Sequence, residues 1–482
     1  MVLNHTENRK TWGIIFGAEQ LTQTQPANPL KILKIPITLG PLELFAKLQS
    51  QHKIAYLLES IEGPKKLAQY SFIGFDPRIT IQANRGKVQI RNQKNEETCV
   101  LDARDPLQLV GAVLREKAIP NREFRFVGGA VGYVSYDAVR YWEKLPESVQ
   151  EDSVFPDLEM GVFDDGFVFN HAAREAFYYY RGENRYPEVE LLLKRSFKLE
   201  ELFFSQPKVN MKKEAYEKSV VKAKDYINTG DIFQVVLSKR YEFRVKGDLL
   251  SFYECLRAVN PSPYMYYYKS GERRIIGSSP EMLFRVDTGF VETFPIAGTR
   301  PAVEDPVENN RLGEELLGDP KERAEHVMLV DLARNDLGRI SKFGSVSVPE
   351  FMKVHQYSHV QHIVSQVKGE LKDNLQSYDA LRAVFPAGTV SGAPKVRAME
   401  IINELEPARR GPYAGAVGYF SYNGNADFAI AIRTLFADHN RAYIQAGAGI
   451  VADSVPETEW FETDHKAQAL MRALDLSGGR MT

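Results

Sequence analysis

Cysteine is scarce in this chain of 482 residues, which contains only Cys99 and Cys255. Two cysteines so far apart offer neither a disulfide framework nor the paired spacing of a zinc site, and they suit a reducing compartment. No segment forms a Lys/Arg block and the net charge is −2, so we expect neither nucleic acid nor an anionic membrane as a partner. No run approaches the ~20 apolar residues that cross a bilayer. Residues 1–25 also lack the apolar core of a secretory signal, and we expect a cytoplasmic protein.

The length allows about two to four average domains, or one large duplicated one. Apolar residues make up 44% of the chain and charged residues 26%, the proportions of an ordinary soluble globular protein. A predicted helix-rich stretch over 187–204 is followed by a charged helix over 212–229. We place a boundary between them, which gives a polar lead-in over 1–30, an N-terminal α+β domain over 31–206 and a second domain over 207–474.

One eight-residue segment occurs twice. Residues 129–136 read GAVGYVSY and residues 415–422 read GAVGYFSY, with a single difference. So long a match favours a duplicated architecture with equivalent strands in each half. Short β-type stretches also predict hairpins over 163–180 and 265–276. The predicted fold class is α+β, with large antiparallel β-sheets packed together and flanked by helices.

Four glutamates form two Glu-x-x-Glu pairs, Glu322 with Glu325 and Glu459 with Glu462. On a helix, positions three apart share a face at about 5–6 Å, so each pair directs two carboxylates toward one point. If the fold brings the pairs together, Mg²⁺ is the cation that such an all-oxygen set favours. Each pair also stands near the start of a predicted helix, where it complements the helix dipole without any metal. Convergence of the pairs in space would distinguish the two interpretations.

Two glycine-rich segments are candidate ligand contacts. The turn over 386–395 leads into a helix, and its free backbone N–H groups suit a carboxylate or a phosphate. Residues 447–452 formally match a dinucleotide fingerprint after a predicted strand. That fingerprint must open a helix, which residues 453–456 (DSVP) make unfavourable, so we reject a Rossmann site. A glycine-lined strand end that touches a flat ligand fits better.

Three histidines, His355, His359 and His362, lie close together in the sequence. The β-branched residues around them favour a strand, in which His359 and His362 point to opposite faces. We therefore do not expect a zinc site, and a single histidine acting in acid–base chemistry stays open.

Four ordered segments resemble the chorismate-utilising enzymes. They are residues 294–301 (FPIAGTRP), residues 322–339 with DLARND at 331–336, the turn at Thr389 and residues 447–462. The resemblance extends from about residue 40 to residue 474 and is strongest to the large components (component I) of anthranilate synthases. It implies that residues 207–474 bind chorismate, aminate it at C2 and eliminate pyruvate. The product would be anthranilate, in the first step of tryptophan biosynthesis.

The resemblance also assigns a metal and a substrate site. Glu325 and Glu462 would be direct Mg²⁺ ligands and Glu322 and Glu459 would complete the shell, so that the ion holds the ring carboxylate of chorismate. The residues that would line the substrate are Tyr413 and Arg433, which grip the pyruvyl carboxylate, and the backbone of Gly298, Thr299, Gly447, Ala448 and Gly449.

Further positions concern the reaction itself. Glu281 would be the general acid for the leaving C4 hydroxyl, and His362 and Thr389 would act around the loss of pyruvate. Gln234 stands where the water-adding relatives, isochorismate and salicylate synthases, have a lysine base. A neutral amide cannot deprotonate water, so ammonia is the favoured nucleophile. Ala297 stands where aminodeoxychorismate synthases commonly have a nucleophilic lysine, which disfavours amination at C4.

The resemblance implies two partners besides chorismate. Neither cysteine lies in an amidotransferase motif, so a separate glutamine amidotransferase subunit would supply ammonia within a hetero-oligomer. Tryptophan would be a feedback inhibitor. Its expected site comprises Ser60, Pro263, Tyr264 and Met265, with Val417 and Tyr419 of the repeated segment in reach of the same pocket.

Two other interpretations stay open. The chain could be an aminodeoxychorismate synthase component I of the folate pathway, or a non-catalytic amino-acid sensor that has kept the fold. Formation of anthranilate and pyruvate separates both from the favoured function.

Overall fold

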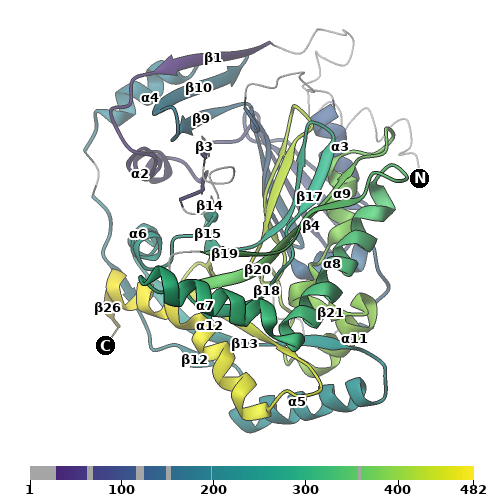
Figure 1. Cartoon of the computed structure of the whole chain (residues 1–482). Coiled ribbons are helices and arrows are strands. Elements are labelled where there is room, and N and C mark those ends of the chain that lie inside the picture. The colour runs from purple at the N-terminus through teal and green to yellow at the C-terminus, as the bar shows by residue number, and fades with distance from the viewer. Residues whose placement is uncertain are drawn as a thin grey trace.

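Two large β-sheets, each built from both halves of the chain, organise the protein (Figure 1). The computed structural model describes residues 29–61, 69–115, 124–147, 154–196, 198–356 and 360–481. Apart from its last two residues, the lead-in predicted over 1–30 lies outside this part of the chain, and so does His359.

The first sheet has fourteen strands and is antiparallel except where β11 and β26 run parallel. Its main path follows the order β1 (Leu30–Ile35), β10 (Glu175–Arg181), β9 (Asp165–Asn170), β3 (Tyr70–Phe75), β2 (Ile54–Glu59), β14 (Tyr264–Ser270), β15 (Arg273–Ser279), β24 (Thr434–Asp438), β25 (Arg441–Ile450), β13 (Gln234–Lys246), β11 (Leu202–Phe204) and β26 (Gly478–Arg480). Two short strands, β12 (Lys208–Val209) and β21 (Gly392–Ala393), pair with β13.

The second sheet has twelve strands. Its main path follows the order β18 (Ile296–Pro301), β20 (Val360–Glu370), β17 (Phe290–Thr293), β16 (Met282–Asp287), β23 (Ala426–Ile430), β22 (Ala416–Ser421), β7 (Gly129–Val134), β8 (Leu158–Phe163), β4 (Ile79–Asn84), β5 (Lys87–Asn92) and β6 (Thr98–Asp102). Strand β19 (Ser347–Gln356) adds to β20.

Helices flank the sheets (Figure 1). The described helices are α2 (Pro41–Gln51), α3 (Pro106–Arg115), the 3-10 helix η2 (Tyr136–Tyr141), α4 (Tyr186–Leu193), α5 (Lys213–Asn228), α6 (Leu250–Val259), α7 (Pro306–Gly318), α8 (Pro320–Ile340), α9 (Ser377–Val384), α10 (Gly388–Ser391), α11 (Lys395–Leu405) and α12 (Pro456–Ser477). In the part of the chain that is described, none of them is long and apolar enough to span a membrane.

The order of elements in the first half recurs in the second. The series β1, α2, β2 to β5, α3, β7 to β10 and α4 has its counterpart in β13, α6, β14 to β17, α9, β22 to β25 and α12. In space, β2 pairs with β14 and β7 with β22, and equivalent strands follow outward from these two central pairs in the same order. The predicted duplication and the α+β fold class are confirmed. Helices α7, α8, α10 and α11 occur within the second copy of the series and interrupt it.

The repeated sequence segment forms one of the two central strand pairs. Strands β7 and β22 are antiparallel, with Gly132 directly opposite Gly418. A Cβ atom at Gly132 would lie 2.0 Å from the carbonyl oxygen of Glu159 on β8, and one at Gly418 would lie 2.1 Å from that of Asp427 on β23. Both distances are far inside van der Waals contact, so the close approach of the outer strands requires glycine at both positions.

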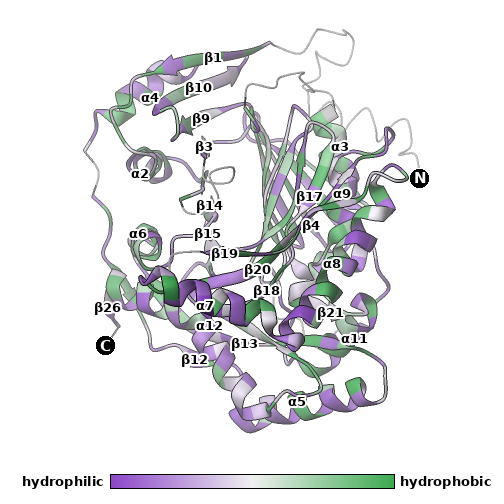
Figure 2. Ribbon diagram, viewed as in Figure 1, coloured by the Kyte–Doolittle hydropathy of each residue, from purple (hydrophilic) through white to green (hydrophobic). Residues whose placement is uncertain are grey.

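The main core contains side chains from both sheets. Aromatic pairs join them, such as Tyr133 of β7 with Tyr268 of β14, whose ring centroids are 6.1 Å apart, and Phe72 of β3 with Tyr419 of β22 at 5.9 Å. Each such pair adds about 0.5–1.5 kcal/mol to the stabilisation that burial of its area provides. A second core lies where α2, α6 and α12 pack on the first sheet. Green and purple residues alternate along these helices in Figure 2, as expected when only one face is buried.

Most local predictions are confirmed, and one is wrong in part. The hairpins expected over 163–180 and 265–276 are β9–β10 and β14–β15, and the charged helix expected over 212–229 is α5. The helix expected over 187–204 ends at Leu193, because Leu202–Phe204 form β11 instead. Pairing of β11 with β13 and β26 supplies backbone partners that local helical preference could not foresee. The domain boundary near residue 207 stays a prediction.

The close contacts at the repeat predict the effect of adding one methyl group. Gly132→Ala and Gly418→Ala should each lower the free energy of unfolding by about 1–3 kcal/mol, because the neighbouring strand must shift. Gly338→Ala is the matched control, since the same methyl group would meet nothing within 4 Å in the exposed part of α8. There it should raise the stability by about 0.5–1 kcal/mol. Urea unfolding midpoints of the three variants test this pattern, which would be contradicted by equal shifts at all three positions.

Candidate active site

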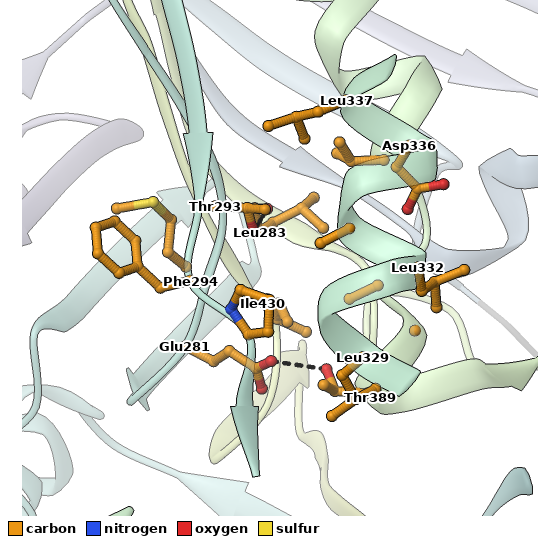
Figure 3. Close-up of a pocket in the computed structure, with 16 residues that line it drawn as sticks. Glu281, Leu283, Thr293, Phe294, Leu329, Leu332, Asp336, Leu337, Thr389 and Ile430 are labelled. Carbon is orange, nitrogen blue, oxygen red and sulfur yellow. Dashed lines mark hydrogen bonds between the residues drawn. The ribbon is translucent and has the colours of Figure 1, made fainter. Parts of the chain in front are cut away.

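A half-buried glutamate lies at the junction of α8, α10 and the second sheet. Glu281 immediately precedes β16, and Figure 3 shows its side chain directed toward Thr389 of α10. The hydroxyl of Thr389 donates a hydrogen bond of 2.8 Å to Oε1 of Glu281. Apolar side chains of α8, including Leu329 and Leu332, line the same small cavity. The cavity has a volume of about 50 Å³ and reaches the Glu281 carboxyl.

This environment raises the pKa of the Glu281 carboxyl to about 7. Burial is the main cause, because the charged form loses its hydration among apolar neighbours. The hydrogen bond from Thr389 and the positive charge of Lys466 oppose the shift. A carboxyl with this pKa is partly protonated at neutral pH and can donate a proton to a leaving group.

Lys466 of α12 connects several parts of the site. Its Nζ donates to the carbonyl oxygen of Gly447 at 3.0 Å and forms an ion pair of 2.7 Å with Oε1 of Glu462. Its own carbonyl oxygen accepts a hydrogen bond of 2.6 Å from Nη1 of Arg433. Sequence reasoning missed this residue. Its position four residues after Glu462, on the same face of a predicted helix, was the available signal.

Tyr413 lies beside Gly447 at the glycine-rich end of β25. Arg433 is connected to the same strand end through Lys466. The burial of Arg433 lowers its pKa, and the neighbouring Tyr413 opposes that shift. A Cβ atom at Gly447 would lie 2.9 Å from the hydroxyl oxygen of Tyr413, so these two residues are in contact. Residues 447–449 belong to β25 and do not open a helix, which confirms the rejection of a Rossmann site.

His362 of β20 faces the turn of β18. Its Nδ1 lies 2.7 Å from the carbonyl oxygen of Gly298 and 3.2 Å from the hydroxyl of Thr299. A carbonyl only accepts, so Nδ1 carries the proton and Nε2 is the basic nitrogen of the neutral ring. Burial lowers the pKa of His362, and the charge of Arg433 adds to this, whereas the hydrogen bond to Gly298 opposes it. The imidazole is therefore neutral at pH 7.

Gln234 begins β13 and contacts the first glutamate pair. Its Nε2 donates to Oε1 of Glu325 at 2.9 Å, while its Oε1 is buried and has no hydrogen-bond partner in the described part of the chain. A Cβ atom at Gly449 would lie 2.7 Å from the same Nε2. Gly298 has a left-handed φ of 66°, and a Cβ atom there would lie 2.9 Å from Oε2 of Glu322. Both glycines thus leave space beside the glutamate pair of α8.

Within each glutamate pair, burial and also the charge of one carboxylate raise the pKa of the other. Burial, and next the charge of Glu325, raise the pKa of Glu322. Burial also raises the pKa of Glu459, a hydrogen bond from Ser454 opposes this, and the charge of Glu462 adds to it. Oε2 of Glu459 is buried, and no described residue forms a hydrogen bond with it. Among the described residues, however, no three His, Cys, Asp or Glu side chains form a group that could hold a metal ion, and convergence of all four glutamates stays a prediction.

A second cavity, of about 60 Å³, lies between the two sheets. It contains all six residues expected at the tryptophan site, namely Ser60, Pro263, Tyr264, Met265, Val417 and Tyr419. Arg285 and Asp427, which form an ion pair of 2.8 Å, also line it, and Asp427 accepts a hydrogen bond of 2.8 Å from the hydroxyl of Tyr264. Oγ of Ser60 is buried there and has no hydrogen-bond partner among the residues that the structure describes.

Residues 53–472 match the family described as chorismate binding enzyme. The chain is 49% identical to anthranilate synthase component 1 of Methanothermobacter marburgensis over 91% of this chain and 93% of that protein. It is 43% identical to anthranilate synthase component 1 of Pseudomonas aeruginosa, again over 91% and 93%. Anthranilate synthase component I from Streptococcus pneumoniae has a similar crystal structure, with a TM-score of 0.73, 38% identity and coverage of 91% of this chain and 98% of that one. The isochorismate synthase MenF of Escherichia coli, at 19% identity and a TM-score of 0.70, shares the fold over 97% of this chain and all of its own.

The raised pKa of Glu281 has a consequence for stability. Between pH 4.5 and about 7 the carboxyl ionises in the unfolded chain but not in the folded one, so it lowers the stability as pH rises through this range. Glu281→Gln keeps an acceptor for Thr389 and has no such charge. Relative to the unmodified protein, its free energy of unfolding should rise by on the order of 2–3 kcal/mol from pH 4.5 to pH 8.

Urea unfolding at both pH values measures this difference. Glu314→Gln, at an exposed position of α7, is the control and should show no pH-dependent gain. A constant difference between Glu281→Gln and the unmodified protein across the range would rule out a pKa near 7.

Proposed function

The chain belongs to the chorismate binding enzyme family, and from that premise we propose that it is the large component of an anthranilate synthase. It adds ammonia at C2 of chorismate and eliminates pyruvate to give anthranilate, the first step of tryptophan biosynthesis. Near-full-length identity of 43–49% to proteins of that name supports this function.

The hydrogen bond between Gln234 and Glu325 is the observation that best supports ammonia, and not water, as the nucleophile. In the water-adding relatives a lysine base stands at this position. Here a neutral amide donates to Glu325 at 2.9 Å, and an amide has no basic lone pair with which to deprotonate water. Ammonia needs no such activation. Ala297, buried on β18, likewise offers no amine for attack on the ring, which favours amination at C2 over the folate-type reaction at C4.

The site residues divide the work of the reaction. Arg433 and Tyr413 hold the pyruvyl carboxylate, while the backbone at Gly298, Thr299, Gly447, Ala448 and Gly449 lines the ring. Glu281, held by Thr389, donates its proton to the C4 hydroxyl as that group leaves and ammonia bonds to C2. Nε2 of His362 then accepts the proton from C2 as the C3–O bond breaks, and the departing enolpyruvate becomes pyruvate while the ring becomes aromatic.

The glutamate pairs have the donor chemistry of a magnesium site. Carboxylate oxygens are the ligands that Mg²⁺ prefers, and Oε2 of Glu459 has no hydrogen-bond partner within the part of the chain that the structure describes. Glu325 and Glu462 would hold the ion directly and Glu322 and Glu459 would complete the shell. When bound, the ion would offset the charge of the ring carboxylate of chorismate.

The ammonia comes from a glutamine amidotransferase subunit in a hetero-oligomer. Cys255 of α6 is a poor nucleophile, because burial and then the charge of Glu254 raise the pKa of its thiol. The other cysteine, Cys99, belongs to edge strand β6. Two cysteines so far apart in the sequence suit the reducing environment of the cytoplasm, where we place the protein.

Tryptophan inhibits the enzyme from the cavity between the sheets. That cavity contains residues of β2 and β14 in the first sheet and of β22 and β23 in the second. A ligand held by both central strand pairs can favour one arrangement of the two sheets, and a coupling of ~1–3 kcal/mol is usual for such regulation.

The product decides the function. With chorismate, Mg²⁺ and ammonium, the chain alone should form fluorescent anthranilate and an equal amount of pyruvate, measured together by mass spectrometry. A C4-aminated product without pyruvate would instead identify an aminodeoxychorismate synthase. Binding of chorismate without turnover would identify an amino-acid sensor.

The inhibitor site is tested by separate variants. Met265→Thr and Ser60→Phe should each raise the tryptophan concentration for half-inhibition at least about tenfold, a loss of ~1.4 kcal/mol in binding. Val100→Thr, exposed on β6, is the control and should leave inhibition unchanged. Inhibition that is the same in all three variants would place tryptophan elsewhere.

A further inference from the structure

A third cavity lies at the opposite end of the central strand pair β2–β14. Its volume is about 270 Å³, which is larger than that of the proposed tryptophan pocket. The start of β2, the turn between β14 and β15, strands β4 and β5 and the turn between β24 and β25 line it. None of the functions proposed above uses this cavity.

The internal duplication makes this cavity the counterpart of the tryptophan pocket. The tryptophan pocket uses the end of β2 and the start of β14, whereas the third cavity uses the start of β2 and the end of β14. Strands β2 and β14 are equivalent in the duplication and run antiparallel. Exchanging the two halves of the chain therefore moves the tryptophan pocket onto the position of the third cavity.

Side chains in the two cavities follow the same equivalence. In the tryptophan pocket, Arg285 of β16 stands opposite Asp427 of β23 and donates to its carboxylate at 2.8 Å. In the third cavity, Gln82 of β4 stands opposite Glu159 of β8 and donates to its carboxylate at 2.7 Å. Strand β4 is the counterpart of β16, and β8 that of β23.

The chemistry of the third cavity is hydrophilic. Aromatic rings line the tryptophan pocket, whereas Ile54 is the one large apolar residue among the described residues of the third cavity. The buried Glu159 behind it accepts hydrogen bonds from Ser270 at 2.6 Å and from Arg273 at 2.9 and 2.7 Å. This carboxylate is therefore fully occupied within the protein and does not compete for a ligand.

Charged side chains of both signs line the third cavity and can contact a ligand. Lys53 is exposed at one side and its Nζ makes no ion pair or hydrogen bond with the described residues, and Arg91 has only a 3.5 Å contact with Glu96. Glu272 and Asp438 line the cavity as well. Oδ2 of Asp438 lies 3.3 Å from Nδ1 of His439. Its Oδ1 is buried and has no hydrogen-bond partner among the described residues, an arrangement that costs free energy unless a donor reaches it.

We infer that this cavity is a second small-molecule site, which binds a small hydrophilic zwitterion such as a polar amino acid. The ligand ammonium donates to Asp438, and its carboxylate lies between Lys53 and Arg91. Acidic lining residues disfavour a phosphorylated dianion, and the lack of an aromatic platform disfavours tryptophan itself.

Isothermal titration calorimetry on the full chain tests this site. L-Serine, L-glutamine and L-glutamate are the probes, each titrated without chorismate and with the tryptophan pocket saturated by L-tryptophan. At least one probe should bind with 1:1 stoichiometry and a Kd of about 1 mM or tighter. Because no turnover is measured, this result stands or fails separately from the proposed enzyme activity.

Variants locate the binding. Lys53→Ala and Asp438→Asn should each weaken the Kd at least about tenfold. Lys53→Arg should restore most of the affinity, because it keeps the charge. Glu314→Gln, exposed on α7, should bind as the unmodified protein does. The inference is overturned if no probe binds, or if binding survives Lys53→Ala, an exposed change that leaves folding intact.

Discussion

Antiparallel pairing across the two halves is the constraint on which the rest of the structure depends. The pairs β2–β14 and β7–β22 each join an N-terminal strand to a C-terminal one, so neither sheet is complete without both halves. The repeated glycines make the second pair possible, because a side chain at Gly132 or Gly418 would meet the backbone of the next strand. The cavity assigned to tryptophan and its counterpart lie at these junctions, where a ligand contacts both halves at once.

The proposed chemistry, by contrast, uses elements that the two halves do not share. Helices α8 and α10, which carry Glu322, Glu325 and Thr389, belong only to the second half, and β20 with His362 extends the sheet beside them. A duplicated scaffold thus keeps its shape while one copy gains a polar site. Within that site, burial alters protonation in opposite directions, since it raises the pKa of Glu281 and lowers that of His362. The same physical cause thus favours the protonated form of the proposed acid and the neutral form of the proposed base.

The sequence predicted well those features that depend on residues close together in the chain. The hairpins, the α5 helix, the repeat and the rejection of a dinucleotide fold all rest on short-range periodicity or turn chemistry. The helix expected over 187–204 failed because β11 is stabilised by strands far away in the sequence. Lys466 was overlooked because its partners, Gly447 and Arg433, come from other elements. The six residues of the tryptophan cavity come from distant segments, so periodicity alone could not have grouped them, and only the family resemblance did.

Gly132 and Gly418 face each other although most of the chain separates them. During synthesis on a ribosome, β2 and β7 emerge long before β14 and β22 exist. Their backbone N–H and C=O groups are then open sheet edges, which attract other nascent chains as readily as their proper partners. Such distant contacts also make folding slow. In a cell, chaperones that shield these edges until the last strands arrive would therefore set how much of this protein reaches its native state.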